Sequence, residues 1–237
     1  MGLTYAQIKD KPKKLLAFTG LTRSEFETLL KAFSEVSQPK VDVTQRGQPR
    51  QRKLGGGRKA RLQRAEDQLL FILFYLKTYP LQEVMSELFG LDVSKVNEWI
   101  HRLLPVVREA LDTLGVLPER DAQAFAKAQA QRRTGRDVII DGTERRRQRP
   151  KKAEKQRLHY SGKKKAHTDK NLVIAERKTR RVSYLSQTYA GTAHDKKIAD
   201  HEKITYAHDT RLHQDTGFQG YQPAVAEIRQ PKKASRA

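Results

Sequence analysis

Apolar residues recur at helical spacing near the start of the chain. Phe26, Leu29, Leu30 and Phe33 repeat every three or four residues. That spacing places their side chains on one face of a helix. Capping candidates precede the run, so we expect residues 1–37 to form an N-terminal helical segment.

The periodicity stops over residues 38–61. This stretch is rich in Gln, Arg, Lys and Gly and has almost no apolar residues. It contains three successive glycines followed by Arg58 and Lys59. Such a composition has nothing to bury, so we expect a flexible basic arm.

Residues 62–115 carry the clearest helical pattern. The pattern predicts three helices. The second covers residues 81–89 and ends at a turn at Gly90, and the third begins near Ser94. Pro105 is expected to kink the third helix. The first helix has an apolar stripe made of Leu62, Ala65, Leu69, Ile72, Leu73 and Leu76. A short helix, a tight turn and a second helix form the pattern of a helix-turn-helix domain.

The pattern changes after a polar linker at residues 116–135, within which a short Ala-rich helix is expected around residues 121–131. Short apolar runs separated by turn residues then predict strands, with one helix running from His194 and Asp195 to about residue 206. The strands are expected at residues 138–140, 172–176, 182–185 and 211–213. The order of strand, hairpin, helix and strand predicts an α/β domain over residues 136–237. The whole chain is therefore expected to be a multi-domain α+β protein.

The charge balance indicates a polyanionic partner. The 237 residues include 48 Lys and Arg against 27 Asp and Glu, which gives a net charge of +21 and a pI near 10.2. Nucleic acid is the usual partner for such an excess. A membrane is the weaker alternative, because no lipidation signal is present and the longest apolar run is too short to cross a bilayer.

Other features of the composition narrow the class further. The chain has no cysteine, which excludes disulfides, thiolate metal sites and cysteine nucleophiles. Its first residues do not form a signal sequence, so we expect a soluble cytoplasmic protein.

The helix-turn-helix pattern assigns a DNA-reading role to the start of the third helix. In that motif the early polar residues of the second helix of the pair meet base edges in the major groove. An ordinary three-helix bundle would show the same spacing, and Trp99 is expected in the core under either interpretation. The candidates for DNA contact are Ser94, Lys95, Asn97, Glu98 and Arg102, with Arg58 and Lys59 in the basic arm.

Two aspartates are the candidates for catalysis. Asp141 follows the apolar residues 138–140 and precedes a glycine, and Asp215 follows a short run and precedes Thr216 and a glycine. Carboxylates at the ends of neighbouring strands can hold a divalent metal for phosphate-ester chemistry. Either aspartate could instead be an ordinary turn residue.

Further charged residues surround these two aspartates. Glu144 could approach the same site or pair with an arginine, and His194 with Asp195 could cap a helix or join the site. Basic residues near the first strand form a candidate rim for the DNA backbone, which would give affinity without base specificity. The rim is expected from three basic runs at residues 145–147, 151–152 and 163–165, with Arg145, Lys163, Lys164 and Lys165 as the main candidates for DNA contact.

Taken together, five segments resemble the DDE transposases of bacterial insertion sequences. They are residues 141–144, 148–150, 160–168, 191–195 and 215–220. The nearest resemblance is to the insertion-sequence-five-like class with an N-terminal helix-turn-helix. It implies a ribonuclease-H-like domain that uses Mg²⁺ or Mn²⁺, with Asp141 and Asp215 as the first and second catalytic carboxylates and metal ligands.

The resemblance also implies the partners of the chain. These are double-stranded DNA at the transposon terminal inverted repeats, target DNA, and a second copy of the chain in a homodimer. The place of action would be the nucleoid in the bacterial cytoplasm. Residues 160–168 would form a strand near the site.

The chain departs from the family pattern in its third acid, a glutamate on a later helix. Glu227 is the only acidic residue after Asp215 and follows it too closely for a strand and a helix to intervene. We therefore expect a partial ribonuclease-H-like domain, truncated before the third acid, with weak or absent strand transfer. The alternative is a non-catalytic DNA-binding fragment or repressor derived from a transposase. An RNA- or ribosome-binding protein would explain the charge but not the two aspartate–glycine segments.

Overall fold

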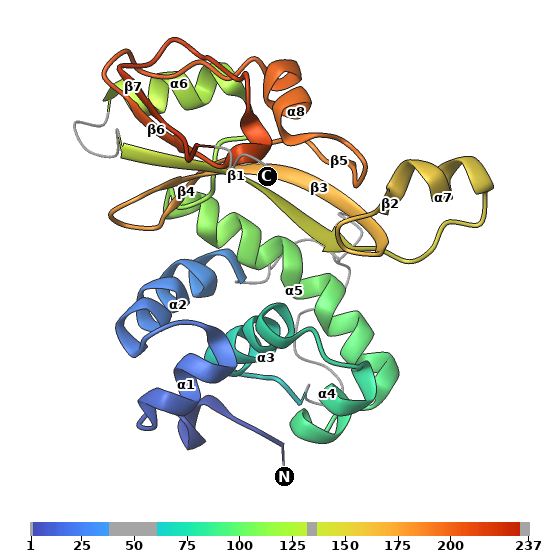
Figure 1. Ribbon diagram of the computed structural model, residues 1–237. Helices are drawn as coiled ribbons and strands as arrows, with labels where there is room; N and C mark the ends of the chain where they lie inside the picture. Colours follow the sequence, from blue (N-terminus) through green and yellow to red (C-terminus); the bar gives the residue numbers. More distant parts are fainter. Residues whose placement is uncertain (1, 38–60, 132–136, 233–237) are drawn as a thin grey trace, which may run out of the picture. The chain divides into compact units, whose positions relative to one another are not determined.

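The chain divides into two compact units, Met1–Val116 and Leu117–Ala237, in the computed structural model. The structure describes residues 2–37, 61–131 and 137–232 (Figure 1). Most of the expected basic arm at residues 38–61 lies outside the described residues, and so do Arg58 and Lys59. Among the described residues, no helix is both long and apolar enough to cross a membrane.

The first unit is helical throughout its described part. Its expected N-terminal helices are confirmed as η1 (Tyr5–Gln7), α1 (Pro12–Thr19) and α2 (Arg23–Ser37). The expected three-helix block is confirmed as α3 (Ala65–Thr78), α4 (Gln82–Phe89) and α5 (Val93–Thr113). The helix α5 is continuous through Pro105, so the loss of one backbone donor does not end the helix there.

The turn between α4 and α5 has the geometry of a helix-turn-helix. Gly90 ends α4 in the left-handed region with φ 63°, which favours glycine because other residues meet a steric penalty from Cβ. Leu91 N then donates to Ser86 O at 3.0 Å, and Asp92 is the N-cap of α5. Only three residues, Gly90 to Asp92, therefore separate α4 from α5.

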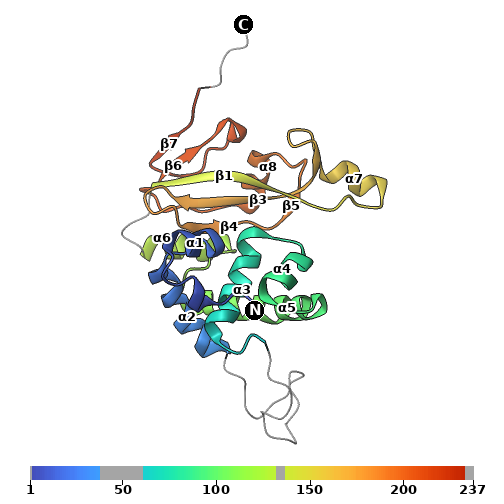
Figure 2. The same cartoon turned by 90° about the horizontal axis from the view of Figure 1, so that it is seen from below.

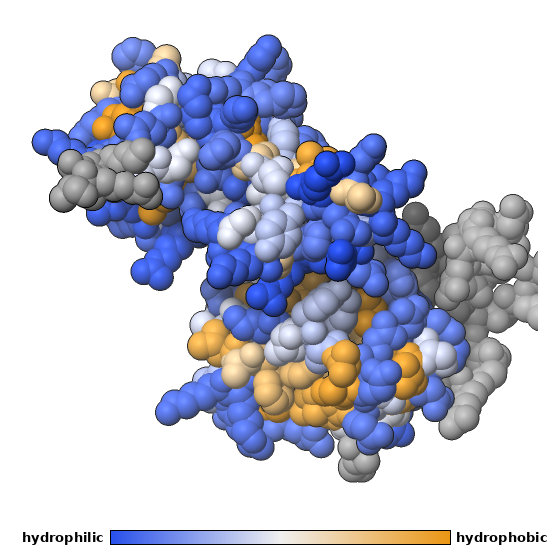
Figure 3. Space-filling view, turned by 45° about the vertical axis from the view of Figure 1, so that its right-hand side comes forward, coloured by the Kyte–Doolittle hydropathy of each residue, from blue (hydrophilic) through white to orange (hydrophobic). Residues whose placement is uncertain are grey.

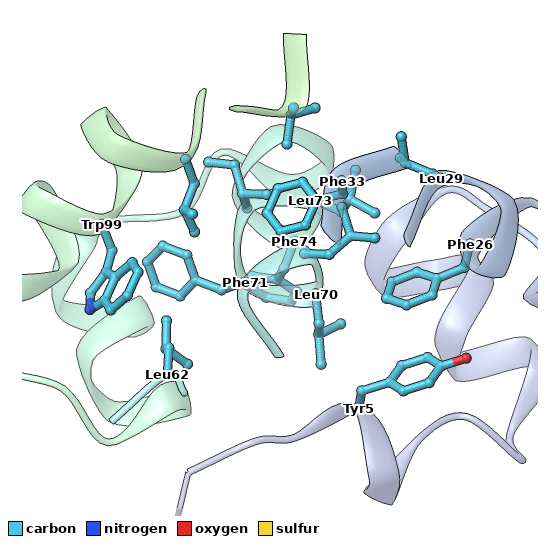
Figure 4. Close-up of a cluster of buried hydrophobic side chains, with 14 of the residues drawn as sticks. Tyr5, Phe26, Leu29, Phe33, Leu62, Leu70, Phe71, Leu73, Phe74 and Trp99 are labelled. Carbon is cyan, nitrogen blue, oxygen red and sulfur yellow. The ribbon is translucent and has the colours of Figure 1, made fainter. Parts of the chain in front are cut away.

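One hydrophobic core joins the N-terminal helices to the helix-turn-helix. Six successive residues of α3, from Leu69 to Phe74, are buried, as expected for a helix that other helices surround. Tyr5 stacks on Phe26 with ring centroids 4.4 Å apart on one side of this core, and Trp99 lies near Phe71 on the other (Figure 4). Trp99 is only 8% exposed, which confirms its expected place in the core.

The second unit is an α/β domain. It begins with α6 (Ala122–Gln131), which confirms the Ala-rich helix expected within the linker. In chain order its remaining elements are β1 (Asp137–Arg146), α7 (Ala153–His159), β2 (Tyr160–Ser161), β3 (Ala166–Glu176), β4 (Val182–Leu185), β5 (Tyr189–Ala190), α8 (Asp195–Glu202), β6 (Arg211–Gln214), η2 (Thr216–Phe218) and β7 (Glu227–Arg229). The expected succession of a helical region and an α/β domain is confirmed.

The sheet is mixed and β1 lies within it. On one side β1 pairs antiparallel with β3, and on the other side it pairs parallel with β6, which in turn pairs parallel with β7. The short strands β2, β4 and β5 all pair with β3. The parallel pair matters for function, because it places the residues that follow Ile140 in β1 and Gln214 in β6 next to each other.

The two faces of β1 have different surroundings. Val138 and Ile140 are buried on one face, in a core to which α6 contributes Phe125 and α8 contributes Ile198. Side chains alternate along a strand, so Ile139, which is 41% exposed, lies on the other face. We call these the covered face and the open face of the sheet.

Several elements differ from the sequence-based expectation. β1 and β3 are far longer than the apolar runs at residues 138–140 and 172–176, because their polar ends continue to pair with each other. The helix α8 stops at Glu202 rather than near residue 206, since Lys203 takes a left-handed conformation with φ 50°. The expected strand at residues 160–168 is instead β2, an exposed turn and the start of β3. The helix α7 and the strand β7 carry no strong apolar pattern and were not expected.

Candidate catalytic site and DNA-binding surfaces

The sheet register places Asp141 and Asp215 side by side. Ile140 is the last residue of β1 paired with β6, and its partner is Gln214. Asp141 and Asp215 are the next residues on these two parallel strands, which lie about 4.8 Å apart. The two aspartates that the sequence singled out, 74 positions apart, therefore lie side by side where the parallel pairing of β1 with β6 ends, although β1 itself continues to Arg146.

Each of these carboxylates accepts a hydrogen bond from the backbone just beyond it. Asp141 Oδ1 accepts from Gly142 N at 2.7 Å, and Asp215 Oδ1 accepts from Gly217 N at 2.8 Å. The second bond makes Asp215 the N-cap of η2. Both aspartates are exposed, and neither forms an ion pair with another described residue. Their remaining lone pairs are available to a ligand.

The donor set at the strand ends suits Mg²⁺ or Mn²⁺. Carboxylate oxygens are the protein ligands that these hard cations prefer, and Mg²⁺ is commonly held by one or two carboxylates together with water and substrate phosphate. Within the described part of the chain, no three Asp, Glu or His side chains converge closely enough to hold a metal on their own. Asp141 and Asp215 thus fit as two ligands of an ion that phosphate and water would complete.

Glu144 lies on the covered face and belongs to a buried ion cluster. Its side chain is 8% exposed, and its Oε2 accepts a hydrogen bond from Thr168 Oγ1 at 3.0 Å. Lys170, its cross-strand partner on β3, places Nζ 3.6 Å from Glu144 Oε1. Burial acts to raise the pKa of Glu144, but hydrogen bonds from Ser161 and Thr168 and the charge of Lys170 outweigh it and hold the pKa below its usual value. Of the two roles considered from sequence, the structure shows ion pairing, with a lysine rather than an arginine.

Asp195 belongs to the same cluster. Its Oδ1 lies 3.1 Å from Lys170 Nζ, and this contact links α8 to β3. The N-cap of α8 is His194, whose exposed side chain makes no capping hydrogen bond, and Asp195 is the first residue of the helix. The expected side-chain cap is therefore absent at His194, and the Asp195 carboxylate turns to Lys170 instead.

Sequence reasoning missed Lys170. The one available signal was its position in the alternation of β3, where Thr168, Lys170, Leu172 and Ile174 share a face and all are buried. A lysine in register with buried leucine and isoleucine needs a counter-charge. Nothing in the sequence identified Glu144 and Asp195 as its partners, because they lie 26 positions before it and 25 after it.

The residues proposed to read DNA lie on the solvent-facing side of α5. Ser94, Lys95, Asn97 and Arg102 are all exposed, whereas Val96 is buried among them. Two of the candidates already have partners within the helix. Lys95 Nζ lies 2.8 Å from Glu98 Oε2, and the Arg102 guanidinium lies 4.9 Å from the centre of the Trp99 ring. Ser94 and Asn97 have no side-chain partner among the described residues, so they could contact base edges without first breaking another interaction.

A basic extension lies between β1 and β3. Of its 21 residues, 145–165, eleven are Lys or Arg and one is acidic. It includes α7, which buries none of its residues and protrudes from the rest of the unit in both ribbon views (Figures 1 and 2). Lys163, Lys164 and Lys165 form the exposed turn between β2 and β3, and the visible face of the unit is mostly hydrophilic (Figure 3). Arg145 differs from these lysines, because its Nη2 donates to Asn171 Oδ1 at 2.8 Å.

Comparison with known proteins gives two matches to family models. Residues 140–236 match the model described as DDE superfamily endonuclease, and residues 60–113 match the helix-turn-helix of DDE superfamily endonuclease. No curated protein and no solved structure gives a match. The matched segments coincide with the α/β unit that carries Asp141 and Asp215 and with the helices α3 to α5. The chain therefore carries a DDE superfamily endonuclease domain, preceded by the helix-turn-helix of that superfamily.

Proposed function

We propose that this protein cleaves DNA at the ends of an insertion sequence of the insertion-sequence-five-like class and joins them to target DNA. The observation that carries the proposal is the adjacency of Asp141 and Asp215, each of which directly follows the last paired residue of the parallel strands β1 and β6. The family matches support a nuclease of this type, and the basic extension supports a DNA substrate.

The chemistry would need Asp141 and Asp215 to hold a divalent ion against a DNA phosphate. Bound Mg²⁺ or Mn²⁺ supplies Lewis-acid activation of water or a 3′-hydroxyl and stabilises the leaving oxygen. The Gly142 and Gly217 amides fix one oxygen of each carboxylate, which leaves the other free for the ion. The parallel pairing of β1 and β6 brings the two ligands next to each other.

Binding to double-stranded DNA would use two kinds of surface. The exposed start of α5 would read base edges at the terminal inverted repeats, with Ser94 and Asn97 as the most available side chains. The basic extension would contact phosphates of the repeats and of target DNA without regard to sequence. Two copies of the chain would be needed to hold two transposon ends, so we include a homodimer in the proposal.

Glu227 is poorly placed to be a third ligand of the metal ion. Because two carboxylates would have to hold the ion, we include slow cleavage in the proposal. Glu227 opens β7, where its carboxylate lies 2.8 Å from Arg229 Nε and 3.6 Å from Arg211 Nε. Arg211 begins β6, whereas Asp215 follows the opposite end of that strand. Glu227 therefore serves an ion-pair cluster at the far end of the strand.

The absence of a three-carboxylate cluster among the described residues favours a second candidate function. A DNA-binding protein without catalysis could occupy the same terminal repeats and repress transposition. The deciding experiment incubates the purified chain with labelled repeat ends in Mg²⁺ or Mn²⁺ and compares the products with an EDTA control. Metal-dependent nicks at the repeat ends support the nuclease. Specific binding without any nick above the EDTA level supports the repressor.

Replacing Asn97 by alanine is expected to weaken binding to the terminal repeat about 5- to 150-fold, as for one base contact worth about 1–3 kcal/mol. Affinity for random DNA should change little, because phosphate contacts do not depend on Asn97. Fluorescence anisotropy with both DNAs at one salt concentration measures the difference. Thr113→Ala, an exposed position near the carboxyl end of α5, is the matched control. An equal loss on both DNAs would remove Asn97 from base reading.

Replacing both Lys163 and Lys164 by alanine is expected to weaken binding to repeat and random DNA alike. The slope of log K against log salt should become shallower by about 0.9 for each phosphate that the lysines no longer neutralise. Titrations at several salt concentrations measure this slope. The double variant Lys13→Ala and Lys14→Ala removes the same charge from the exposed side of α1 and should leave the slope nearer to wild type. Equal slopes in the two double variants would argue against a specific role for the β2–β3 turn.

A further inference from the structure

The Asp195 carboxylate fills the space that two glycines beside the proposed metal ligands leave open. Gly142 follows Asp141 directly, and a Cβ on Gly142 would lie 2.3 Å from Asp195 Oδ1. Gly217 follows Asp215 by two residues, and a Cβ there would lie 3.0 Å from both Asp195 Oδ2 and Asp215 Oδ1. One carboxylate thus touches the backbone that follows each of the two proposed ligands.

Asp195 is itself held from a third direction. Lys170 Nζ lies 3.1 Å from Asp195 Oδ1 and donates to Ala193 O at 2.9 Å, so it binds both the helix start and a residue just before the helix. The Lys170 side chain is 9% exposed, and Glu144 balances it on its other side. The lysine projects from β3, which is fixed to β1 over nine paired positions. The position of the Asp195 carboxylate is therefore tied to the sheet.

We propose that Asp195 is a positioning residue for the metal site. Its carboxylate, held by Lys170, acts as a spacer between the Gly142 and Gly217 backbones and so sets the separation of Asp141 and Asp215. The inference rests on the proposed function of those two aspartates as metal ligands. Mg²⁺ demands near-ideal octahedral geometry, so a small change in ligand separation weakens its binding.

The contacts of Asp195 distinguish the spacer role from helix capping and from a purely electrostatic effect of its negative charge. Capping is excluded by position, because His194 is the N-cap of α8. A purely electrostatic role would depend mainly on the charge of Asp195 and would tolerate a small displacement of the carboxylate. A spacer depends on location, so displacing the carboxylate should harm the site even when its charge remains.

Gly142→Ala makes that displacement. Its new Cβ would overlap Asp195 Oδ1, so either the carboxylate or β1 must shift, while the charge is kept. In an Asp195→Ala background the overlap is gone, so Gly142→Ala should add nothing further. Gly162→Ala is the matched control, because a Cβ there meets no atom within 4 Å.

The experiment measures Mn²⁺ binding to the full chain by electron paramagnetic resonance of the free ion. We expect Asp195→Ala and Gly142→Ala each to weaken Mn²⁺ binding about 10- to 100-fold, the usual effect of losing a partner that orients metal ligands. The double variant should bind like Asp195→Ala alone, and Gly162→Ala like wild type. Circular dichroism confirms that each variant is folded, and Asp195→Ser replaces Asp195→Ala in the cycle if the latter does not fold.

Two results would overturn the proposal. Wild-type binding by Gly142→Ala would show that the location of the carboxylate is irrelevant, and multiplied effects in the double variant would show that the two positions act independently. Asp141→Asn separates this outcome from a failure of the proposed function. If Asp141→Asn binds Mn²⁺ as tightly as wild type, Asp141 is not a metal ligand and the proposed function fails. If Asp141→Asn binds Mn²⁺ more weakly but Gly142→Ala binds it like wild type, only the spacer role of Asp195 is rejected.

Discussion

Asp141→Asn is expected to reduce metal-dependent cleavage of repeat ends by about three powers of ten, or to the EDTA level. A carboxylate that holds a catalytic ion contributes several kcal/mol to the transition state, and each 1.36 kcal/mol is about a factor of ten in rate. Asparagine keeps the size of the side chain and loses the negative charge. Single-turnover cleavage of labelled DNA with excess protein measures the loss, and Asp215→Asn should show the same defect.

Binding to the same DNA should survive both substitutions, because the helix-turn-helix lies in the other unit. Asp200→Asn is the matched control, since Asp200 is an exposed aspartate of the same unit whose carboxylate pairs only with exposed Lys196 among the described residues. Undiminished nicking by Asp141→Asn would refute the proposed role of Asp141. A parallel loss in Asp200→Asn would point to a general effect of charge.

Lys170→Met is expected to destabilise the second unit by about 3–5 kcal/mol at pH 7. Removing one partner of a buried ion cluster leaves the other charges without compensation, and that cost is much larger than the worth of a surface pair. Here Glu144 and Asp195 would lose their shared cation. Urea unfolding followed by circular dichroism measures the difference in the free energy of unfolding.

The pH dependence gives this prediction a second readout. In the wild type the lowered pKa of Glu144 stabilises the fold above its usual value near 4.5, and this stabilisation is lost as the pH falls through the lowered pKa. Without Lys170 the burial of Glu144 acts to raise the pKa, and protonation relieves the uncompensated charge. The difference in the free energy of unfolding between Lys170→Met and wild type should therefore become smaller as the pH falls below about 4.5.

Lys196→Met provides the comparison for Lys170→Met. Lys196 pairs with Asp200 on α8, and both side chains are more than one-third exposed. Exposed pairs contribute about 0–1 kcal/mol, so this variant should unfold close to wild type at every pH. A cost for Lys170→Met no larger than that for Lys196→Met would show that the cluster is solvated rather than buried.

The helical unit was largely readable from the sequence because helix formation is local. The 3.6-residue period, the turn at Gly90 and the position of Trp99 lie within a few residues of the features they determine. The sheet was only partly readable. Apolar runs located the buried centres of β1 and β3, but their polar ends are strands only because each has the other as a partner. Similarly, β7 is a strand because it pairs with β6.

Some residues of the candidate site could likewise be predicted from local sequence, whereas others depend on contacts between distant parts of the chain. Asp141 and Asp215 stand out because an aspartate before a glycine at a strand end is a local pattern. The cluster of Lys170, Glu144 and Asp195 depends on the register of β1 with β3 and on where α8 begins. No local pattern encodes that register, so the lysine and the contact between Asp195 and Gly142 emerged only from the fold.

The alternation of side chains along β1 gives one strand two separate duties. Asp141 faces outward with Ile139, and Glu144 faces inward with Ile140, although only three positions divide them. Substitutions at outward positions would change the rate of DNA cleavage with little effect on the stability of the fold. Substitutions at inward positions would lower that stability. Directed evolution of this protein could therefore explore Thr143 and its outward neighbours while holding the inward row constant.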